Sequence, residues 1–264
     1  SSVISAGSKC ARKELFTLNL GGTAIGTTIN ASDYYLHHIV PTLAAVTGYP
    51  LMQADDLFDA TENLDGFVTI SNTLKTCAVN LSKMCNDLRL LASGPRCGLA
   101  EFNLPARQPG SSIMPGKVNP VIPEVMNQIA YKVIGNELCV TMSGEAAQME
   151  LNAMEPVMAQ CDFESAELLM NGFDTLRTLC VDGITANRER CADYVKNSIG
   201  VVTALNPIIG YKNSTKIAKE ALATGRGVYD LVLEHGILSK EELDTILKPE
   251  NMIRPVKLNI KPRK

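Results

Sequence analysis

The feature that most constrains the fold of this sequence is an unbroken apolar seam between residues 67 and 91. Its members are spaced three and four residues apart: Phe67, Ile70, Leu74, Cys77, Leu81, Met84, Leu88 and Leu91. This heptad spacing is typical of a long helix that packs lengthwise against other helices. Shorter seams of the same kind comprise Ile122, Met126, Ile129 and Val133, and then Leu169, Phe173, Leu176 and Cys180. The pattern predicts an all-α fold with a bundle of long helices as its core.

The helical pattern changes near residue 183. The segment from Asp182 to Asn187 contains Gly183 and breaks the helical pattern just after the third seam, and the helices beyond it are shorter. Ser239 followed by Glu242 has the spacing of a capping box, which begins a short helix. We therefore expect a central helical-bundle domain over residues 1–182 and a small helical C-terminal domain over residues 183–264.

Composition excludes several function classes. The 264 residues carry 25 Lys and Arg against 28 Asp and Glu, a net charge of −3, so no basic surface for nucleic acid is expected. No apolar run reaches the roughly 18 residues that span a bilayer, so we expect no membrane partner. The eight cysteines form no CxxC pair, and we expect free thiols in a reducing cytoplasm. His37, His38 and His235 are the only histidines, and we expect them to be structural and the chain to hold no metal.

The segment between the first two seams is the most informative about chemistry. It is rich in proline and glycine and ends in Gly110-Ser111-Ser112-Ile113-Met114-Pro115-Gly116-Lys117-Val118-Asn119-Pro120. Five residues lie between the two glycines, where a phosphate-binding loop has four, and Val118 follows the lysine, so the spacing does not match such a loop. Two hydroxyls, an ammonium and an amide on a flexible loop suit a carboxylate ligand, and a serine beside such donors can act as a base. On composition alone, a mobile polar surface loop is the alternative.

This loop closely resembles the signature loop of the aspartase/fumarase superfamily, with the pattern G-S-S-x-M-P-x-K-x-N-P intact. Similar segments extend the resemblance over almost the whole chain: Gly21–Thr27, Asn86–Arg89, Ser93–Arg96 and Leu205–Pro207. Two further segments, Ala54–Thr61 and Leu151–Val157, are more similar to aspartases than to fumarases. Thr28 departs from the pattern, because members of the family usually have glycine there.

The resemblance implies a fold, a reaction and a set of roles. It implies an ammonia-lyase that converts L-aspartate reversibly to fumarate and ammonia without a cofactor, through an aci-carboxylate intermediate. Ser111 would be the catalytic base, and Ser112, Lys117 and Asn119 would bind the dicarboxylate substrate. Gly110, Gly116 and Glu124 would support the loop, although Glu124 could equally be an ordinary carboxylate at the start of a helix. The resemblance also implies a homotetramer in which three subunits build each active site.

The family resemblance leaves alternatives open. A fumarate hydratase of the same superfamily and a catalytically silent relative share the fold and much of the pattern. Chains of this family are considerably longer, and the sequence corresponds to their C-terminal part, with the bundle domain incomplete at its N-terminal side. We therefore expect this chain alone to have weak lyase activity or none.

Overall fold

The structure, a computed structural model, describes residues 9, 12, 14–110, 113, 114, 116–253 and 260. Its backbone divides into two compact units, residues 1–185 and residues 186–264. The boundary therefore lies three residues beyond the position expected from the sequence. Both units are built from helices, which confirms the predicted all-α fold class. Within the described part of the chain, no helix combines the length and apolar character needed to cross a membrane.

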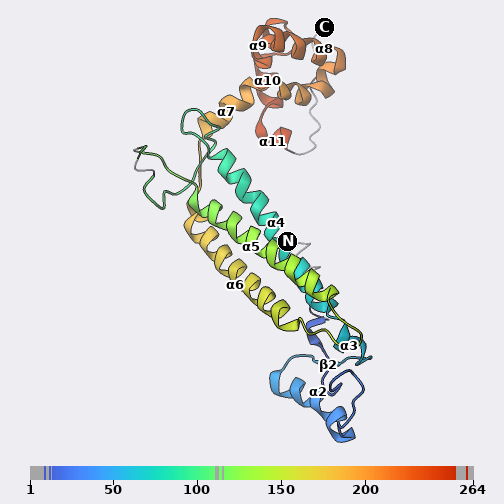
Figure 1. The fold of residues 1–264 in the computed structure, drawn as a ribbon. Coiled ribbons are helices and arrows are strands. Elements are labelled where there is room, and N and C mark those ends of the chain that lie inside the picture. The colour runs from blue at the N-terminus through green and yellow to red at the C-terminus, as the bar shows by residue number, and fades with distance from the viewer. Residues whose placement is uncertain are drawn as a thin grey trace. The chain divides into compact units, whose positions relative to one another are not determined.

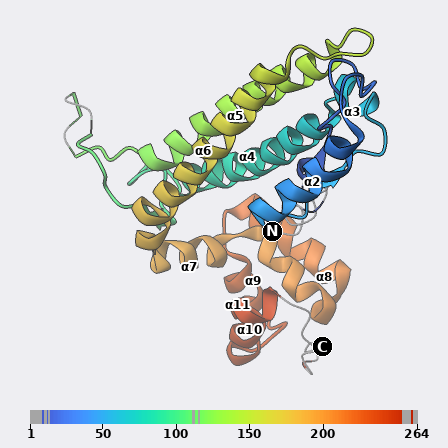
Figure 2. The same cartoon turned by 90° about the horizontal axis from the view of Figure 1, so that it is seen from below.

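Three long helices form the body of the first unit: α4 (Asp65–Leu91), α5 (Val121–Glu145) and α6 (Glu155–Leu179). Figures 1 and 2 both show them lying side by side along their lengths. Their shared core contains Cys77, Ala78, Leu81 and Cys85 from α4, Met126, Ala130 and Val133 from α5, and Leu169, Leu176 and Cys180 from α6 and its C-cap. Most residues of the predicted seams lie in or against this core or the smaller one beside Met158, whereas Ile70, Leu88 and Leu91 are half-buried outside both. Met84 and Phe173 are exposed, because Cys85 and Gly172 take the inward positions.

Short elements complete the first unit near the start of α4. Helix α2 (Asp33–Thr47) is capped by Ser32, whose hydroxyl accepts from the Tyr35 amide. Strand β1 (Thr17–Leu18) pairs in parallel with β2 (Met52–Gln53), and α3 (Asp59–Glu62) follows. At the other end of the bundle, strand β3 (Phe102–Asn103) pairs with β4 (Thr185–Ala186), and the 3-10 helix η1 (Val181–Gly183) directly follows α6 and its cap.

The second unit is a cluster of shorter helices with its own core. It contains α7 (Arg188–Asn197), the 3-10 helix η2 (Ile199–Val201), α8 (Val202–Thr224), α9 (Val228–Glu234), α10 (Lys240–Ile246) and α11 (Pro249–Met252). The core is aliphatic, with Leu205, Leu231 and Leu243 fully buried. The predicted capping box at Ser239 and Glu242 is confirmed, with both reciprocal hydrogen bonds present.

One carboxyl group in the bundle is buried and poorly satisfied by its surroundings. The Asp162 side chain on α6 belongs to a residue only 8% exposed, and neither of its oxygens has a hydrogen-bond partner among the described residues. Burial raises the pKa of this carboxyl from 3.8 to about 6, while the Ser71 hydroxyl on α4 acts slightly in the opposite direction. Burial without a partner disfavours the ionised form, so Asp162 costs stability at neutral pH.

We expect Asp162→Asn to stabilise the fold more at pH 7.5 than at pH 4.5. The raised pKa means that the folded state keeps a proton that the unfolded state has lost. Stability therefore falls as the pH rises from 3.8 toward 6. The neutral amide removes this dependence, and the gain in free energy of unfolding should grow by about 2 kcal/mol between the two pH values. Urea titrations at both pH values measure it. Glu167→Gln, at an exposed position of the same helix, is the control, and an equal gain at both pH values would contradict the assignment.

Candidate functional site

The segment that joins α4 to α5 is anchored at its base by contacts with the end of α6. Arg107 donates from Nε to the Leu179 carbonyl oxygen over 2.6 Å and from Nη2 to that of Thr178 over 3.4 Å. These carbonyls lie at the end of α6, where a cation complements the helix dipole. Asn103 Nδ2 donates to Thr185 Oγ1 over 3.2 Å. The segment is therefore held against the end of α6, while residues 106–109 and most described residues of the tip are exposed.

The tip of this segment is a tight loop in which Gly110 approaches Lys117. A Cβ atom added at Gly110 would lie 1.7 Å from the Lys117 carbonyl oxygen, so only glycine fits. The Lys117 amide donates to the Met114 carbonyl oxygen over 3.2 Å, and Gly116 has a φ of 80°. Ser111 and Ser112, the predicted base and its neighbour, lie outside the described residues.

Gly110→Ala is expected to reduce turnover in the full-length protein at least tenfold, because the new methyl group forces Gly110 away from Lys117. The loop lies outside the core, so the free energy of unfolding should change by less than about 0.5 kcal/mol. Steady-state kinetics and urea unfolding measure the two effects. Gly227→Ala is the control: this glycine is the N-cap of α9 with a φ of −68°, and a Cβ atom there would meet only ordinary contacts of 3.6 Å or more, so the change should leave turnover unaltered. Equal activity of both variants would show that the Gly110 approach is unimportant.

The loop runs directly into the amino end of α5. Pro120 is the N-cap residue of this helix, Asn119 precedes it and is half-buried, and Lys117 is exposed two residues earlier. The amino end of a 25-residue helix carries a partial positive charge and free amide groups. Lys117 and Asn119 therefore lie beside a helix terminus that favours anions, and such a terminus suits a carboxylate.

Glu124 lies in the first turn of α5 and contacts α4. Its Oε1 atom is 3.8 Å from Arg89 Nη2, and both side chains are about 40% exposed. Arg89 also donates from Nη1 to Asn127 Oδ1 over 3.2 Å. Asn127 is buried and donates in turn to the Ser82 hydroxyl and carbonyl oxygens. Arg89 thus connects Glu124 to a buried polar network between α4 and α5. Reasoning from the sequence missed this role, although Arg89 stands in one of the segments that carry the family resemblance.

Each of the three histidines contacts a nearby group within its own unit. His37 and His38 contact the carbonyl oxygens of Asp33 and Tyr34 through Nδ1, both over 2.7 Å on α2. His235 caps α9, and its Nε2 atom lies 2.8 Å from Glu220 Oε2. All three therefore have local partners, and none of them pairs with Glu124 in this chain.

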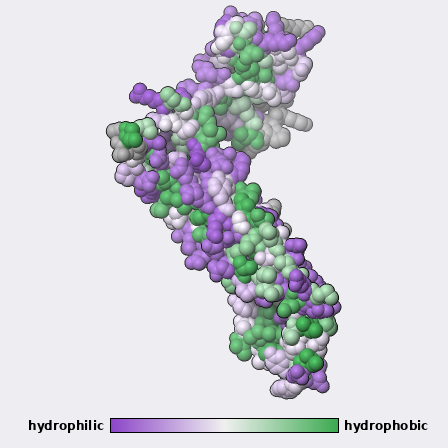
Figure 3. All heavy atoms as spheres, in the orientation of Figure 1, coloured by the Kyte–Doolittle hydropathy of each residue, from purple (hydrophilic) through white to green (hydrophobic). Residues whose placement is uncertain are grey.

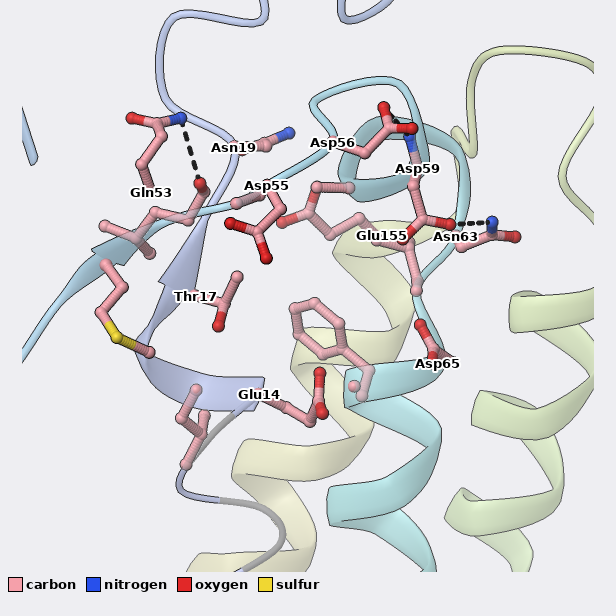
Figure 4. A pocket seen from close by; sticks show the side chains of 18 of the residues that line it. Glu14, Thr17, Asn19, Gln53, Asp55, Asp56, Asp59, Asn63, Asp65 and Glu155 are labelled. Carbon is pink, nitrogen blue, oxygen red and sulfur yellow. Dashed lines mark hydrogen bonds between the residues drawn. The ribbon is translucent and has the colours of Figure 1, made fainter. Parts of the chain in front are cut away.

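A second concave region lies at the opposite end of α4 from the loop. This pocket has a volume of about 590 Å³, and six carboxylates line it: Glu14, Asp55, Asp56, Asp59, Asp65 and Glu155 (Figure 4). It brings together the two segments, 54–61 and 151–157, that resemble aspartases more than fumarases. Among the described residues that line it, none is Lys or Arg. A dicarboxylate would be repelled there, so the loop is the better candidate site for such a ligand.

Two of these carboxylates accept hydrogen bonds from nearby groups. Asp56 Oδ1 accepts from the Phe58 and Asp59 amides at the start of α3, and Asp59 Oδ1 accepts from Asn63 Nδ2 over 2.8 Å. No group of His, Cys, Asp and Glu within the described ranges has an arrangement that could hold a metal ion.

Comparison with known proteins identifies the family. Residues 8–135 match the family model described as lyase, and residues 201–254 match the model described as fumarase C C-terminus. The aspartate ammonia-lyase of Pseudomonas fluorescens is 59% identical over 243 residues, which cover 92% of this chain and 51% of that protein. The aspartate ammonia-lyase of Escherichia coli K12 is 52% identical over 241 residues, which cover 91% of this chain and 50% of that protein. The chain thus spans about half the length of the curated relatives that it matches.

Solved structures agree with the sequence matches. The fumarate lyase:delta crystallin of Brucella melitensis, determined bound to cobalt, superposes with a TM-score of 0.88 at 46% identity, covering 95% of this chain and 55% of that one. The class II fumarase of Schistosoma mansoni also has a TM-score of 0.88, at 32% identity, covering 97% of this chain and 57% of that one. Together with the loop and the three-helix body, these matches show that the chain belongs to the aspartase/fumarase superfamily of lyases.

Proposed function

We propose that the full-length protein to which this sequence belongs is an ammonia-lyase that interconverts L-aspartate with fumarate and ammonia. The observation that carries the proposal is the loop at residues 110–120, which places Lys117 and Asn119 at the positively polarised end of α5. Relatives named aspartate ammonia-lyase, at 58% and 59% identity, support the choice of substrate. The partner is therefore a small dicarboxylate.

In this mechanism the loop residues have different roles. Ser111 removes a proton from Cβ of aspartate, and the electron pair moves toward the neighbouring carboxylate to give an aci-carboxylate dianion. The C–N bond at Cα then breaks, the double bond forms, and ammonia leaves. The Cβ proton is weakly acidic, so stabilisation of the dianion by positioned donors dominates the rate. Lys117, Asn119, Ser112 and the amino end of α5 supply such donors.

A fumarate hydratase is the second candidate, favoured by the class II fumarase of Schistosoma mansoni among the similar structures. Incubating the full-length protein with fumarate and ammonia, and separately with fumarate alone, distinguishes the two reactions by product. We expect aspartate in the first reaction and no malate in the second. Malate as the main product would replace the proposed function with hydration, and neither product would favour a catalytically silent relative.

We propose that the protein assembles as a homotetramer through its long helices. Large apolar side chains are exposed at helical spacing on α5 (Tyr131, Leu138, Met142) and on α6 (Phe163, Met170). Figure 3 shows green hydrophobic patches on the visible face of the bundle. Patches of this kind on a soluble helix bundle mark a protein interface.

Sedimentation equilibrium is expected to give a tetramer at micromolar concentration, because a lone three-helix body leaves these apolar stripes in water. Leu138→Glu combined with Phe163→Glu should shift the equilibrium toward smaller species by placing charges on both stripes. Tyr211→Glu, at an exposed position on α8, is the control. A stable monomer of the unmodified chain would contradict the assembly.

We propose that the protein acts in the cytoplasm. Seven of its cysteines are described, and all of them are free thiols. Burial raises the pKa of the Cys85 thiol to about 11, so this thiol stays protonated and unreactive at neutral pH. Free thiols are typical of proteins in a reducing compartment.

A further inference from the structure

Charges of both signs lie at the amino end of α5, the helix terminus assigned to the dicarboxylate under the proposed function. Glu124 is the acidic residue in the first turn of this helix. A carboxylate there offsets the positive polarisation of the free amide groups at the helix terminus. It also repels a dianion that binds nearby. An anion site at this terminus therefore requires that the charge of Glu124 be compensated.

Arg89, near the end of α4, provides the compensating charge. Its Nη2 atom lies 3.8 Å from Glu124 Oε1, which is longer than a hydrogen bond, so the interaction is one between charges. Both side chains are about 40% exposed, and ion pairs at such positions contribute little to folding stability. No other Lys, Arg or His among the described residues forms an ion pair with Glu124. The main consequence of the pair is therefore electrostatic: the amino end of α5 keeps its net attraction for an anion.

Other contacts hold the Arg89 guanidinium in this place. Its Nη1 atom donates to Asn127 Oδ1 over 3.2 Å. Asn127 is only 2% exposed and donates to the Ser82 hydroxyl over 2.9 Å, so its amide is fixed between α4 and α5. The Nε atom of Arg89 is buried and has no hydrogen-bond partner among the described residues. The guanidinium therefore interacts with α5 through its Nη groups, and its charge is held beside the first turn of that helix.

We propose that Arg89 sets the affinity of the site for dicarboxylates by neutralising Glu124. Arg89 contacts Glu124 and not the ligand, so it is a positioning residue that acts through the charge of its partner. Without Arg89, a free carboxylate would remain in the first turn of α5 and would oppose the attraction of Lys117 and the helix terminus for the ligand. The inference rests on the proposed function, because it takes the ligand to be a dicarboxylate bound at this terminus.

Titration calorimetry of the full-length protein with succinate tests this role without turnover. Arg89→Met removes the charge but keeps an unbranched side chain, and we expect it to bind succinate about three- to tenfold more weakly than the unmodified protein. The difference should shrink between about 0.05 M and 0.5 M sodium chloride, because salt screens charges at exposed positions. A loss of affinity that salt does not reduce would contradict an electrostatic role. Arg226→Met is the matched control: Arg226 forms an exposed ion pair with Glu234 in the C-terminal unit, and its loss should leave the affinity unchanged.

Variants of Glu124 separate this role from a purely structural one. Glu124→Gln keeps Arg89 and its bond to Asn127 but removes the negative charge, so succinate should bind up to about threefold more tightly. Combining it with Arg89→Met removes both charges, and the double variant should bind succinate within about twofold of the unmodified protein. If Arg89 only held α5 in place, the double variant would bind as weakly as Arg89→Met, and that result would overturn the inference. Weaker binding by Glu124→Gln alone would also overturn it.

Product analysis keeps this test apart from that of the proposed function. Aspartate formed from fumarate and ammonia, with equal succinate affinity in all the variants, would overturn the inference alone. The expected order of affinities without aspartate formation would overturn the ammonia-lyase reaction alone. Failure of the unmodified protein to bind succinate would overturn both.

Discussion

Replacing Ser111 with alanine in the full-length protein is expected to abolish nearly all elimination activity while substrate affinity changes by no more than roughly tenfold. The serine would remove the Cβ proton in the transition state, and it would contribute little to binding of the ground state. Loss of a positioned base typically costs about 10²–10⁴ in rate. Steady-state rates of ammonia release, together with inhibition by succinate, measure the two effects separately.

Ser112→Ala provides the contrast, because Ser112 is proposed to bind a substrate carboxylate. We expect its KM to rise while a measurable kcat remains. If Ser111→Ala turned over at a near-normal rate, the proton would be removed by another group and Ser111 would have no place in the mechanism. If both variants lost kcat equally, the loop rather than one hydroxyl would be the source of the effect.

The predicted long helices are present because heptad spacing reports directly on which face of a helix is apolar. The inward face differs in detail from the predicted seams. On α4, Ala78 and Cys85 are fully buried, whereas Met84 is 40% exposed. On α6, Gly172 is buried and a Cβ atom there would lie 2.9 Å from Ile129 Cδ1. Small residues let helices approach closely, and a search for large apolar residues overlooks them.

Polar residues in the core were harder to predict than the helices. Asn127 and Asp162 are both buried, although their side chains alone would favour a surface position. Asn127 is stabilised by Ser82 and Arg89 on α4, residues that are 45 and 38 positions away in the chain. Only the packing of α4 against α5 brings these groups together, so no local pattern reveals them.

The candidate site was predictable as a motif but not as a geometry. The residue types of the loop indicate carboxylate chemistry, and the family resemblance assigns the roles. The anchors of the loop were not predictable, because Arg107 contacts the end of α6 across 72 positions of sequence. The backbone conformation also explains why members of the family usually have glycine where this chain has Thr28. Thr28 has a φ of 59°, in the left-handed region that favours glycine, so the turn is kept at the cost of backbone strain.

Lys117→Ala is expected to weaken inhibition by succinate and to lower kcat/KM, each by about 10- to 100-fold, in the full-length protein. Lys117 is exposed, and it lies three residues before the N-cap of α5. Its ammonium and the helix terminus would therefore face the same carboxylate, and removal of the ammonium leaves only the weaker partner. A charge-assisted hydrogen bond contributes more than a neutral one, so this loss should exceed that of Asn119→Ala.

Lys83→Ala is the matched control for this variant. Lys83 is an exposed lysine on α4 that pairs with Asp87 one turn later, and such a surface pair contributes little to stability. Its loss should leave both succinate inhibition and turnover unchanged. Lys117→Arg should recover part of the succinate affinity, because the positive charge returns, but less of the turnover, because the planar guanidinium has a different geometry. If Lys117→Ala bound succinate as tightly as the unmodified protein, Lys117 would face solvent, and the carboxylate would be bound by other groups.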